Sequence, residues 1–309
     1  MNCPHHFQIY REKPRSYRDL PLRLAENATV YRYEKSGELN GLFRVRALTQ
    51  DDTHTFVRYD QIPDEIDRIL ELTIFILETF GFSNYRARIS TSDPKTPEKY
   101  LGKPDTWQKA EKALADAVAR HNIPSVIGVG EAAFYGPKID IMVKDAIGRE
   151  WQLTTVQLDF NQSENFDMNY VNEEGKLERP AVLHIAILGS FDRFIGILIE
   201  NYAGAFPLWL APTQLGLVPI AERHNVDAQK AAEKLKTAGI RVEVDDRNER
   251  MQAKIRDLTL QKVPYLGIIG DREVESSTVS VRKRNGEDLK AMSIEDLISR
   301  LTHEIESKT

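Results

Sequence analysis

The pattern of expected secondary structure changes at a short proline-containing segment, FPLWLAP at residues 206–212. Before this segment, strands come in adjacent pairs that are separated by long amphipathic helices. After it, single strands alternate with helices. Paired strands favour an antiparallel sheet, whereas alternating strands and helices favour a mostly parallel sheet covered by helices. We therefore predict two domains, 1–209 and 210–309, since 309 residues are enough for two hydrophobic cores.

The first domain is predicted to be α+β, an antiparallel sheet with flanking helices. Its expected strands are residues 29–34, 42–50, 138–143 and 151–160, and its expected helices run over about 64–80, from 104 onward and from 190 onward. The segment 35–41 is typical of a turn between the first two strands, which would place Arg44 and Arg46 on one strand face. Neither of the glycine-rich sequences that bind nucleotide phosphates, GxGxxG and GxxxxGKS/T, occurs in the chain.

The second domain is predicted to be a smaller α/β unit. Its expected strands are residues 214–220, 240–244, 265–269 and 279–281, and its expected helices cover 227–238, 251–258 and the segment after Ser293. Gly239 directly follows the first of these helices, where glycine is a common C-terminal cap, and Ser293 is a typical N-cap. Strands that alternate with helices in this way predict a mostly parallel sheet.

Composition and hydropathy exclude several classes of protein. The longest apolar stretch, residues 66–80, contains Arg68, Glu71 and Glu78, so it does not have the sequence of a membrane span. The first residues, MNCPHHFQIYREK, lack the apolar core of a signal peptide, and the single cysteine, Cys3, excludes an intramolecular disulfide. We therefore expect a cytoplasmic protein. The net charge of −5 neither indicates nor excludes nucleic-acid binding, which needs only a local basic patch.

Three residues, Cys3, His54 and His184, form a candidate zinc site. A thiolate and two imidazoles are good zinc ligands, and three protein ligands leave one coordination position open for a substrate. The three residues are too far apart in the sequence to form a zinc finger. Other histidines are available, and a lone cysteine near a terminus is usually a small buried apolar residue, so the spacing alone leaves the metal undecided.

Arginines form a second candidate constellation. Arg32, Arg44 and Arg46 lie on the first expected strand pair, and their planar guanidinium groups suit bidentate binding of phosphate and carboxylate oxygens. The alternative is a solvated sheet face on which these arginines pair with Glu34 and Asp51.

A third candidate is the segment GSFDRFIGILIENYAG, residues 189–204. It is predicted to start a helix at Ser190, with Arg193 in the first turn, where the helix dipole disfavours a cation. Such an arginine either binds an anionic ligand or is an ordinary surface residue.

Six segments occur in one order along the chain: NCPHH, YRYEKSGELNGLFRVRALTQDDTHTF, GEAAFYGPKIDI, TTVQLDF, LHIAILGSFDRF and WLAP. Together they resemble the motif series of the threonyl-tRNA synthetases, which are class II aminoacyl-tRNA synthetases. The resemblance continues through DDRNERMQAKIRD and GDREVE near the end. It implies a class II catalytic domain over 1–209, without motif 1 and the editing region that precede it in the family, and an anticodon-binding domain over 210–309.

The resemblance also implies a role for each candidate residue. The implied zinc ligands are Cys3, His54 and His184, with one Zn²⁺ per chain; the catalytic and ATP-binding residues are Arg32, Glu34, Arg44, Arg193 and Lys138; the amino-acid pocket is Gln50, Asp52, Tyr135 and Gln157; and the anticodon-binding residues are Asn248, Glu273 and Arg282. Three residues depart from the family pattern, namely His5, Leu48 and Ile185.

The function implied is activation of threonine by ATP with Mg²⁺, followed by transfer to tRNA(Thr). Zinc would select threonine over valine, and the family forms homodimers. One alternative is a non-catalytic class II paralogue or fragment that binds tRNA or a protein partner. Another is a different class II synthetase, such as the prolyl type, which the Cys–His–His set and TQDDTH disfavour.

Overall fold

The computed structural model describes residues 2–308, which divide into two compact units between residues 198 and 199. Arg241 and Arg284 of the second unit donate hydrogen bonds to backbone carbonyls within residues 205–211. These bonds hold the proline-containing segment against the second unit. The predicted domain boundary falls within this segment.

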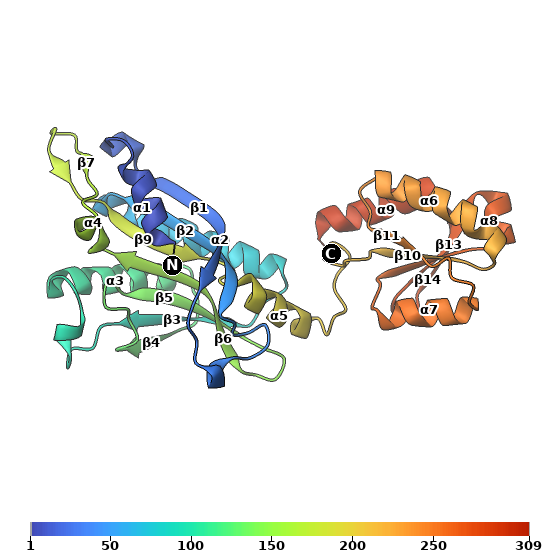
Figure 1. Cartoon of the computed structure of the whole chain (residues 1–309), viewed down its shortest axis with the longest axis horizontal. Helices are drawn as coiled ribbons and strands as arrows, with labels where there is room; N and C mark the ends of the chain where they lie inside the picture. The colour runs from blue at the N-terminus through green and yellow to red at the C-terminus, as the bar shows by residue number, and fades with distance from the viewer. Residues whose placement is uncertain (1, 309) are drawn as a thin grey trace. The chain divides into compact units, whose positions relative to one another are not determined.

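The first unit is built on a seven-stranded sheet (Figure 1). Its strands are β1 (Leu22–Tyr31), β2 (Ala47–Val57), β3 (Tyr85–Thr91), β4 (Ser125–Val129), β5 (Lys138–Lys144), β6 (Glu150–Asp159) and β9 (Ala181–Ala186). Their order in the sheet is β1-β2-β9-β6-β5-β3-β4, and every neighbouring pair is antiparallel except β3 and β4. The predicted α+β fold with an antiparallel sheet is therefore confirmed.

Helices cover both faces of this sheet. They are α1 (Cys3–Arg11), α2 (Ile62–Thr79), α3 (Pro104–Arg120), the single turn α4 (Gln162–Asn165) and α5 (Phe191–Asn201); the hairpin β7 (Tyr170–Val171) and β8 (Leu177–Glu178) completes the unit. α1 crosses one face near β2 and β9, where Phe7 and Tyr10 pack against Phe56 (Figure 1). On the opposite face, alternate residues of β5 such as Ile139 and Ile141 are fully buried, and α2 and α3 supply apolar stripes to cover them.

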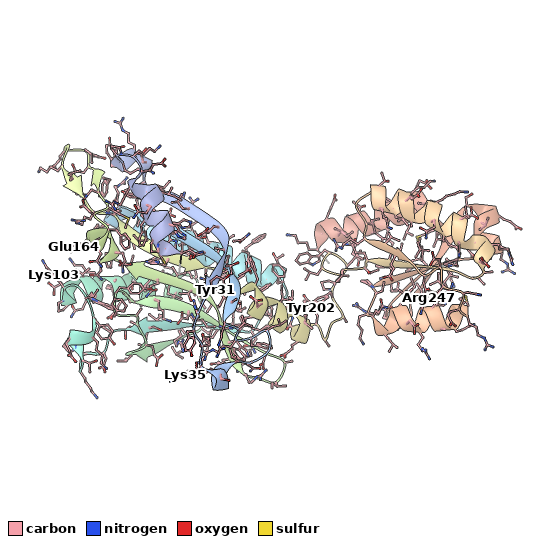
Figure 2. All side chains as sticks on the ribbon, viewed as in Figure 1. Tyr31, Lys35, Lys103, Glu164, Tyr202 and Arg247 are labelled. Atoms are coloured by element: carbon pink, nitrogen blue, oxygen red, sulfur yellow. The ribbon has the colours of Figure 1, made fainter. Side chains whose placement is uncertain are left out.

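The first strand pair differs from the prediction. The expected strands 29–34 and 42–50 are replaced by β1, which ends at Tyr31, and β2, which begins at Ala47. Residues 32–46 form a loop between them, in which Lys35 extends beyond the end of β1 (Figure 2).

The expectation that Arg44 and Arg46 share a strand face is therefore wrong, because both lie before the start of β2. No side chain of residues 32–46 is buried, whereas the second half of β2 is almost completely buried. Pairing is stable where the apolar side chains gain burial, and this gain lies further along the chain than the arginine-rich segment.

The second unit contains a five-stranded sheet with helices on it. Its elements are β10 (Leu215–Pro219), α6 (Asn225–Thr237), β11 (Val242–Val244), α7 (Met251–Leu260), β12 (Tyr265–Ile269), α8 (Asp271–Ser276), β13 (Thr278–Lys283), β14 (Asp288–Ser293) and α9 (Ile294–Ser307). The strand order is β11-β10-β12-β13-β14. β10 is parallel to both of its neighbours, but β13 is antiparallel to β12 and to β14. A short turn at Gly286 joins β13 to β14, and such a turn can only join antiparallel strands. The α/β prediction is confirmed, with a sheet that is mixed.

No helix within residues 2–308 has the length and the apolar character that a membrane span requires.

Candidate active site

A pocket of about 520 Å³ opens on the polar face of the seven-stranded sheet. It is lined by the predicted site residues of the first unit other than His54: Cys3, Arg32, Glu34, Arg44, Gln50, Asp52, Tyr135, Lys138, Gln157, His184 and Arg193. His54 is fully buried and lies next to Cys3 and His184. Residues that are far apart in the sequence thus meet at one site, and their individual roles stay predictions.

Cross-strand pairing explains how several of these residues meet. His54 of β2 lies directly opposite His184 of β9, and His184 lies opposite Gln157 of β6. Gln157 in turn lies opposite Lys138 of β5. Directly opposite side chains share one face of a sheet, so a single row of pairs carries these four residues to the same side.

Cys3, His54 and His184 bring one sulfur and two ring nitrogens within 4.8 Å of one another. Among the described residues, the Nε2 atom of His54 is buried without a hydrogen-bond partner. Such a nitrogen is costly unless something binds it, so it fits a metal ligand. Burial, helped by the nearby His184 and His6, lowers the pKa of His54 to about 2 and keeps its ring neutral, as metal binding requires.

Carboxylates and a third histidine orient the two histidines of this site. His184 Nε2 donates to Asp159 Oδ2 at 2.9 Å, which leaves Nδ1 for a metal. The Nδ1 atoms of His54 and His6 are 2.8 Å apart, and His6 Nε2 lies 3.5 Å from Glu26 Oε1. When the proton of His54 is on Nδ1, it is donated to His6 and the Nε2 lone pair stays available.

No helix was predicted for the segment that forms α1, yet the sequence of this segment has the pattern of a helix. Cys3, His6, Phe7 and Tyr10 have the spacing i, i+3, i+4 and i+7 of one helix face, and Pro4 lies in the first turn, where proline is favoured. The first of these four is half-buried and the others are buried. This periodicity identifies His6 as a residue that shares a face with the cysteine.

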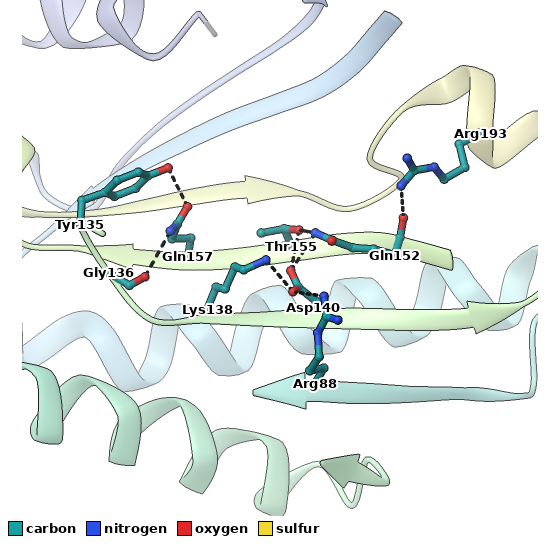
Figure 3. A network of polar contacts seen from close by, with 9 residues as sticks. All are labelled: Arg88, Tyr135, Gly136, Lys138, Asp140, Gln152, Thr155, Gln157 and Arg193. Carbon is teal, nitrogen blue, oxygen red and sulfur yellow. Dashed lines mark hydrogen bonds and ion pairs between the residues drawn. The ribbon is translucent and has the colours of Figure 1, made fainter. Parts of the chain in front are cut away.

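The pocket wall beside these ligands is polar and already arranged. Tyr135 Oη donates to Gln157 Oε1 at 2.9 Å, and Gln157 Nε2 donates to the Gly136 carbonyl at 3.2 Å (Figure 3). Only glycine fits at 136, since a Cβ there would lie 1.8 Å from the Leu158 carbonyl oxygen. Burial raises the pKa of Asp52, and its Oδ2 has no hydrogen-bond partner in the described part of the chain. A buried carboxylate oxygen of this kind fits the ammonium or hydroxyl group of a ligand.

Three arginines, Arg32, Arg44 and Arg193, line the rest of the pocket together with Glu34. Burial, followed by the charges of Arg44 and Arg32, lowers the pKa of Arg193. Glu34 Oε2 lies 4.0 Å from Arg44 Nε. The excess of positive charge suits a ligand that carries phosphate groups.

Arg193 is held by backbone atoms rather than by carboxylates. Its Nη1 donates to the Gln152 carbonyl (Figure 3) and its Nε donates to the Phe43 carbonyl, both at 2.8 Å. Its guanidinium group lies 5.4 Å from the centre of the Trp151 ring. The helix predicted to begin near Ser190 is α5, and the residue expected in its first turn is fixed there against the loop that carries Phe43.

Asp51, a possible partner of the arginines in the sequence, has another role. Its carboxylate accepts hydrogen bonds from the amides of Ile187, Leu188 and Gly189, at 2.7, 2.7 and 2.9 Å. These three amides form the turn between β9 and α5. Asp51 therefore fixes the start of α5, and adjacent aspartates at 51 and 52 serve opposite faces of one strand.

The three residues that depart from the family pattern are spread around the site. His5 is exposed on α1, whereas Leu48 and Ile185 line the pocket and are 7% and 5% exposed. Leu48 gives the pocket an aliphatic wall.

The residues predicted to read the anticodon lie on three elements of the second unit. Asn248 is exposed in the loop between β11 and α7, Glu273 is in α8, and Arg282 is exposed on β13. Glu273 Oε2 accepts a hydrogen bond from the Gly270 amide at 3.0 Å, which caps the start of α8. A role in anticodon binding stays a prediction for all three.

Two family models match the chain. A model described as the tRNA synthetase class II core domain (G, H, P, S and T) matches residues 1–202. A model described as an anticodon binding domain matches residues 214–304. The two matches together span most of both structural units.

Known relatives agree with these models. The threonine–tRNA ligase of Deinococcus radiodurans is 55% identical over 290 residues, which are 94% of this chain and 44% of the relative. A structure described as the RNA binding domain of threonyl-tRNA synthetase from Cryptosporidium parvum Iowa II has a TM-score of 0.91 and 35% identity, covering 98% of this chain and 75% of that one. A putative threonyl-tRNA synthetase from Aeropyrum pernix has a TM-score of 0.82 and 31% identity, covering 100% and 75%. The chain spans less than half the length of the curated relatives it matches.

Proposed function

We propose that this chain, which belongs to the threonyl-tRNA synthetase family, activates threonine with ATP and transfers the threonyl group to tRNA(Thr). One observation carries the proposal: Cys3, His184 and three arginines line one pocket, and His54 is buried directly beside Cys3 and His184. An amino acid held at Cys3, His54 and His184 would direct its carboxylate toward the arginines proposed to bind phosphate.

The residues Cys3, His54 and His184 would hold one zinc ion per chain. When bound, zinc supplies a Lewis acid that can coordinate the amino and hydroxyl groups of threonine together. Asp52, whose Oδ2 has no hydrogen-bond partner within residues 2–308, would accept a hydrogen bond from the threonine hydroxyl group. Valine lacks that hydroxyl group and would leave Asp52 unsatisfied in a buried position.

Selection against serine is expected to be weaker. Serine has the same amino and hydroxyl groups as threonine and lacks only one methyl group, which is worth about 1–3 kcal/mol. A hydrophobic pocket alone would separate threonine from valine by only about 10²-fold. The polar groups of this pocket are therefore suited to exclude valine rather than serine.

In the activation step, the threonine carboxylate attacks the α-phosphorus of ATP, and the bond to the bridging oxygen breaks to release pyrophosphate. Arg32 would stabilise the charge that develops at the α-phosphate, and Mg²⁺ would offset the charge of the departing phosphates. Glu34, Arg44 and Arg193 would contact the rest of the nucleotide. Lys138, which lies opposite Gln157 in the sheet, would present its ammonium group to the same site.

The second unit would bind the tRNA through its anticodon. The match to an anticodon-binding model over residues 214–304 supports this role. Asn248, Glu273 and Arg282 are the proposed contacts, and the exposure of Asn248 and Arg282 leaves both accessible to a nucleic acid.

Amino-acid-dependent ATP–pyrophosphate exchange tests the activation step on the purified chain. We expect exchange with threonine, weaker exchange with serine and none with valine, and we expect a zinc chelator to abolish the first two. An Arg32→Ala variant should lower kcat by about 10²–10³-fold, since removal of one donor to a developing oxyanion has this effect.

The opposite result has a clear meaning. A folded sample that retains zinc but shows no exchange with threonine is not an activating enzyme, and tRNA binding without catalysis then becomes the function to test. Exchange that survives complete removal of zinc would overturn the role of Cys3, His54 and His184 in threonine binding.

A further inference from the structure

Asp140 of β5 lies at the centre of a buried polar network beside the pocket (Figure 3). Its Oδ2 accepts hydrogen bonds from Lys138 Nζ at 2.7 Å and Arg88 Nη2 at 3.1 Å. Its Oδ1 accepts hydrogen bonds from Gln152 Nε2 at 2.8 Å and Thr155 Oγ1 at 3.0 Å. Each oxygen thus accepts two hydrogen bonds, which uses the full acceptor capacity of an ionised carboxylate.

A β-bulge brings two of these donors to one carboxylate. Asp140 pairs with Thr155 and Met142 pairs with Gln152, so the register shifts between the two pairs. The step from Asp140 to Met142 covers two residues of β5, whereas the matching step from Thr155 to Gln152 covers three residues of β6. In a regular strand, Gln152 and Thr155 would point to opposite faces of the sheet, and the bulge turns both toward Asp140.

The network reaches the groups proposed to act on the substrates. Lys138, Gln152 and Thr155 line the pocket. The carbonyl of Gln152 accepts the hydrogen bond from Arg193 (Figure 3). Asp140 itself is fully buried and both of its oxygens are occupied, so it cannot bind a substrate or Mg²⁺ without losing a partner. Any effect of Asp140 on the reaction has to pass through the residues that it holds.

The charges of the network also indicate that Asp140 acts through the residues that it holds. Lys138 and Arg88 carry two positive charges and Asp140 carries one negative charge, so the group keeps a net positive charge. An ammonium group has three N–H donors, and Asp140 takes one from Lys138. Two donors remain for a carboxylate or phosphate oxygen in the pocket. Asp140 therefore fixes the position of Lys138 without cancelling the positive charge that an anionic ligand needs.

We propose that Asp140 is a positioning residue for threonine activation, which holds the Lys138 ammonium group and the β6 bulge in the geometry of the active site. Its kinetic consequence rests on the proposed function. Its structural consequence, a restrained Lys138, rests only on the contacts around Asp140.

The variant Asp140→Asn tests both consequences. Asparagine keeps the size of the side chain but has no negative charge and only one acceptor oxygen, so it cannot hold all four donors, and its pairing with Lys138 is weakened. We expect kcat for threonine-dependent exchange to fall by about 10²-fold, because a shift of about 1 Å at a reacting group costs that much. The KM values for threonine and ATP should change far less. Acylation of Lys138 by an amine-directed reagent, followed by mass spectrometry, should become faster.

Glu65→Gln provides a matched control. Glu65 is a buried carboxylate that pairs with Arg23 between α2 and β1, away from the pocket. Its substitution should lower stability without changing kcat or the labelling rate of Lys138. If Asp140→Asn does not fold, Thr155→Val removes a single donor and should change kcat and labelling in the same direction by a smaller factor.

The outcomes separate this proposal from the proposed function. Exchange by the wild-type chain with an unchanged kcat in Asp140→Asn overturns the positioning role. No exchange by the wild-type chain overturns the proposed function, and Lys138 labelling then decides the positioning role by itself. Faster labelling in Asp140→Asn but not in Glu65→Gln supports it, and equal labelling in all three proteins overturns it.

Discussion

The two ends of the pocket differ in how firmly the protein holds them. At the end near α1, His54 and Asp52 are 0% and 3% exposed, and His184 is backed by Asp159. At the other end, residues 32–46 form a loop without a buried side chain. The Arg44 side chain in this loop is 42% exposed and lies 4.0 Å from Glu34.

This difference matches what each end would have to recognise. Threonine is small and offers few contacts, so a selective site needs each group fixed before the ligand arrives. ATP is large and offers many contacts, so a loop that becomes ordered around it can still give adequate affinity. Arg193 is the exception at the end proposed to bind ATP, because two backbone carbonyls fix it in advance.

The largest effect should follow from removing a ligand at the firmly held end. We expect His54→Ala to lose the zinc ion that metal analysis should find in the wild-type chain. Threonine-dependent exchange should then be lost as it is with a chelator, so kcat/KM for threonine should fall by about 10⁴–10⁵-fold, toward the level of valine.

His5→Ala is the control for this experiment, because His5 is the exposed neighbour of the buried His6 on the same helix. It should keep both zinc and threonine-dependent exchange. If His54→Ala also kept zinc, the firm geometry at this end would serve the fold and not a metal.

A smaller effect should follow from removing the groups that orient His54. His6→Ala removes the partner of His54 Nδ1, and Glu26→Gln weakens the charge behind His6. Groups of this kind typically change metal affinity by about 10–100-fold. We therefore expect zinc to be retained but lost at lower chelator concentrations, with the larger change in His6→Ala. Chelator competition measures this directly, and an affinity equal to that of the wild type would assign both residues to the core of α1 alone.

The sequence predicted the parts of the fold that depend on local periodicity. α2, α3 and α5 appear close to their expected positions because a 3.6-residue apolar pattern extends over several turns in each. α1 has only nine residues, and its apolar face could not be recognised because that face includes a buried histidine, His6. The first strand pair was misplaced because TQDDTH is polar, although it forms a buried strand over the site.

A different reason explains why the sequence did not predict the acidic residues that hold the site residues in place. Glu26, Asp140 and Asp159 are ordinary acidic residues in the sequence. Their partners are set by strand register, and for Asp140 by a bulge in the neighbouring strand. A shift of one residue would turn each carboxylate to the other face of the sheet. Motif resemblance names the residues that would touch the substrates, whereas only the paired sheet reveals what holds them.

The smallest effect should come from the loop at the end proposed to bind ATP. Arg44→Ala removes an exposed guanidinium group whose ion pairs with Glu34 and Glu38 are 4.0 and 3.7 Å long. Pairs of this kind are worth about 0–1 kcal/mol, so the KM for ATP should rise by at most about fivefold, with zinc content and the KM for threonine unchanged. Arg46→Ala is the matched control, since Arg46 donates to the Glu34 carbonyl in the same loop. A loss of activity in Arg44→Ala as large as that in His54→Ala would show that the exposed loop contributes as much to the reaction as the buried end, and the contrast between the two ends would no longer hold.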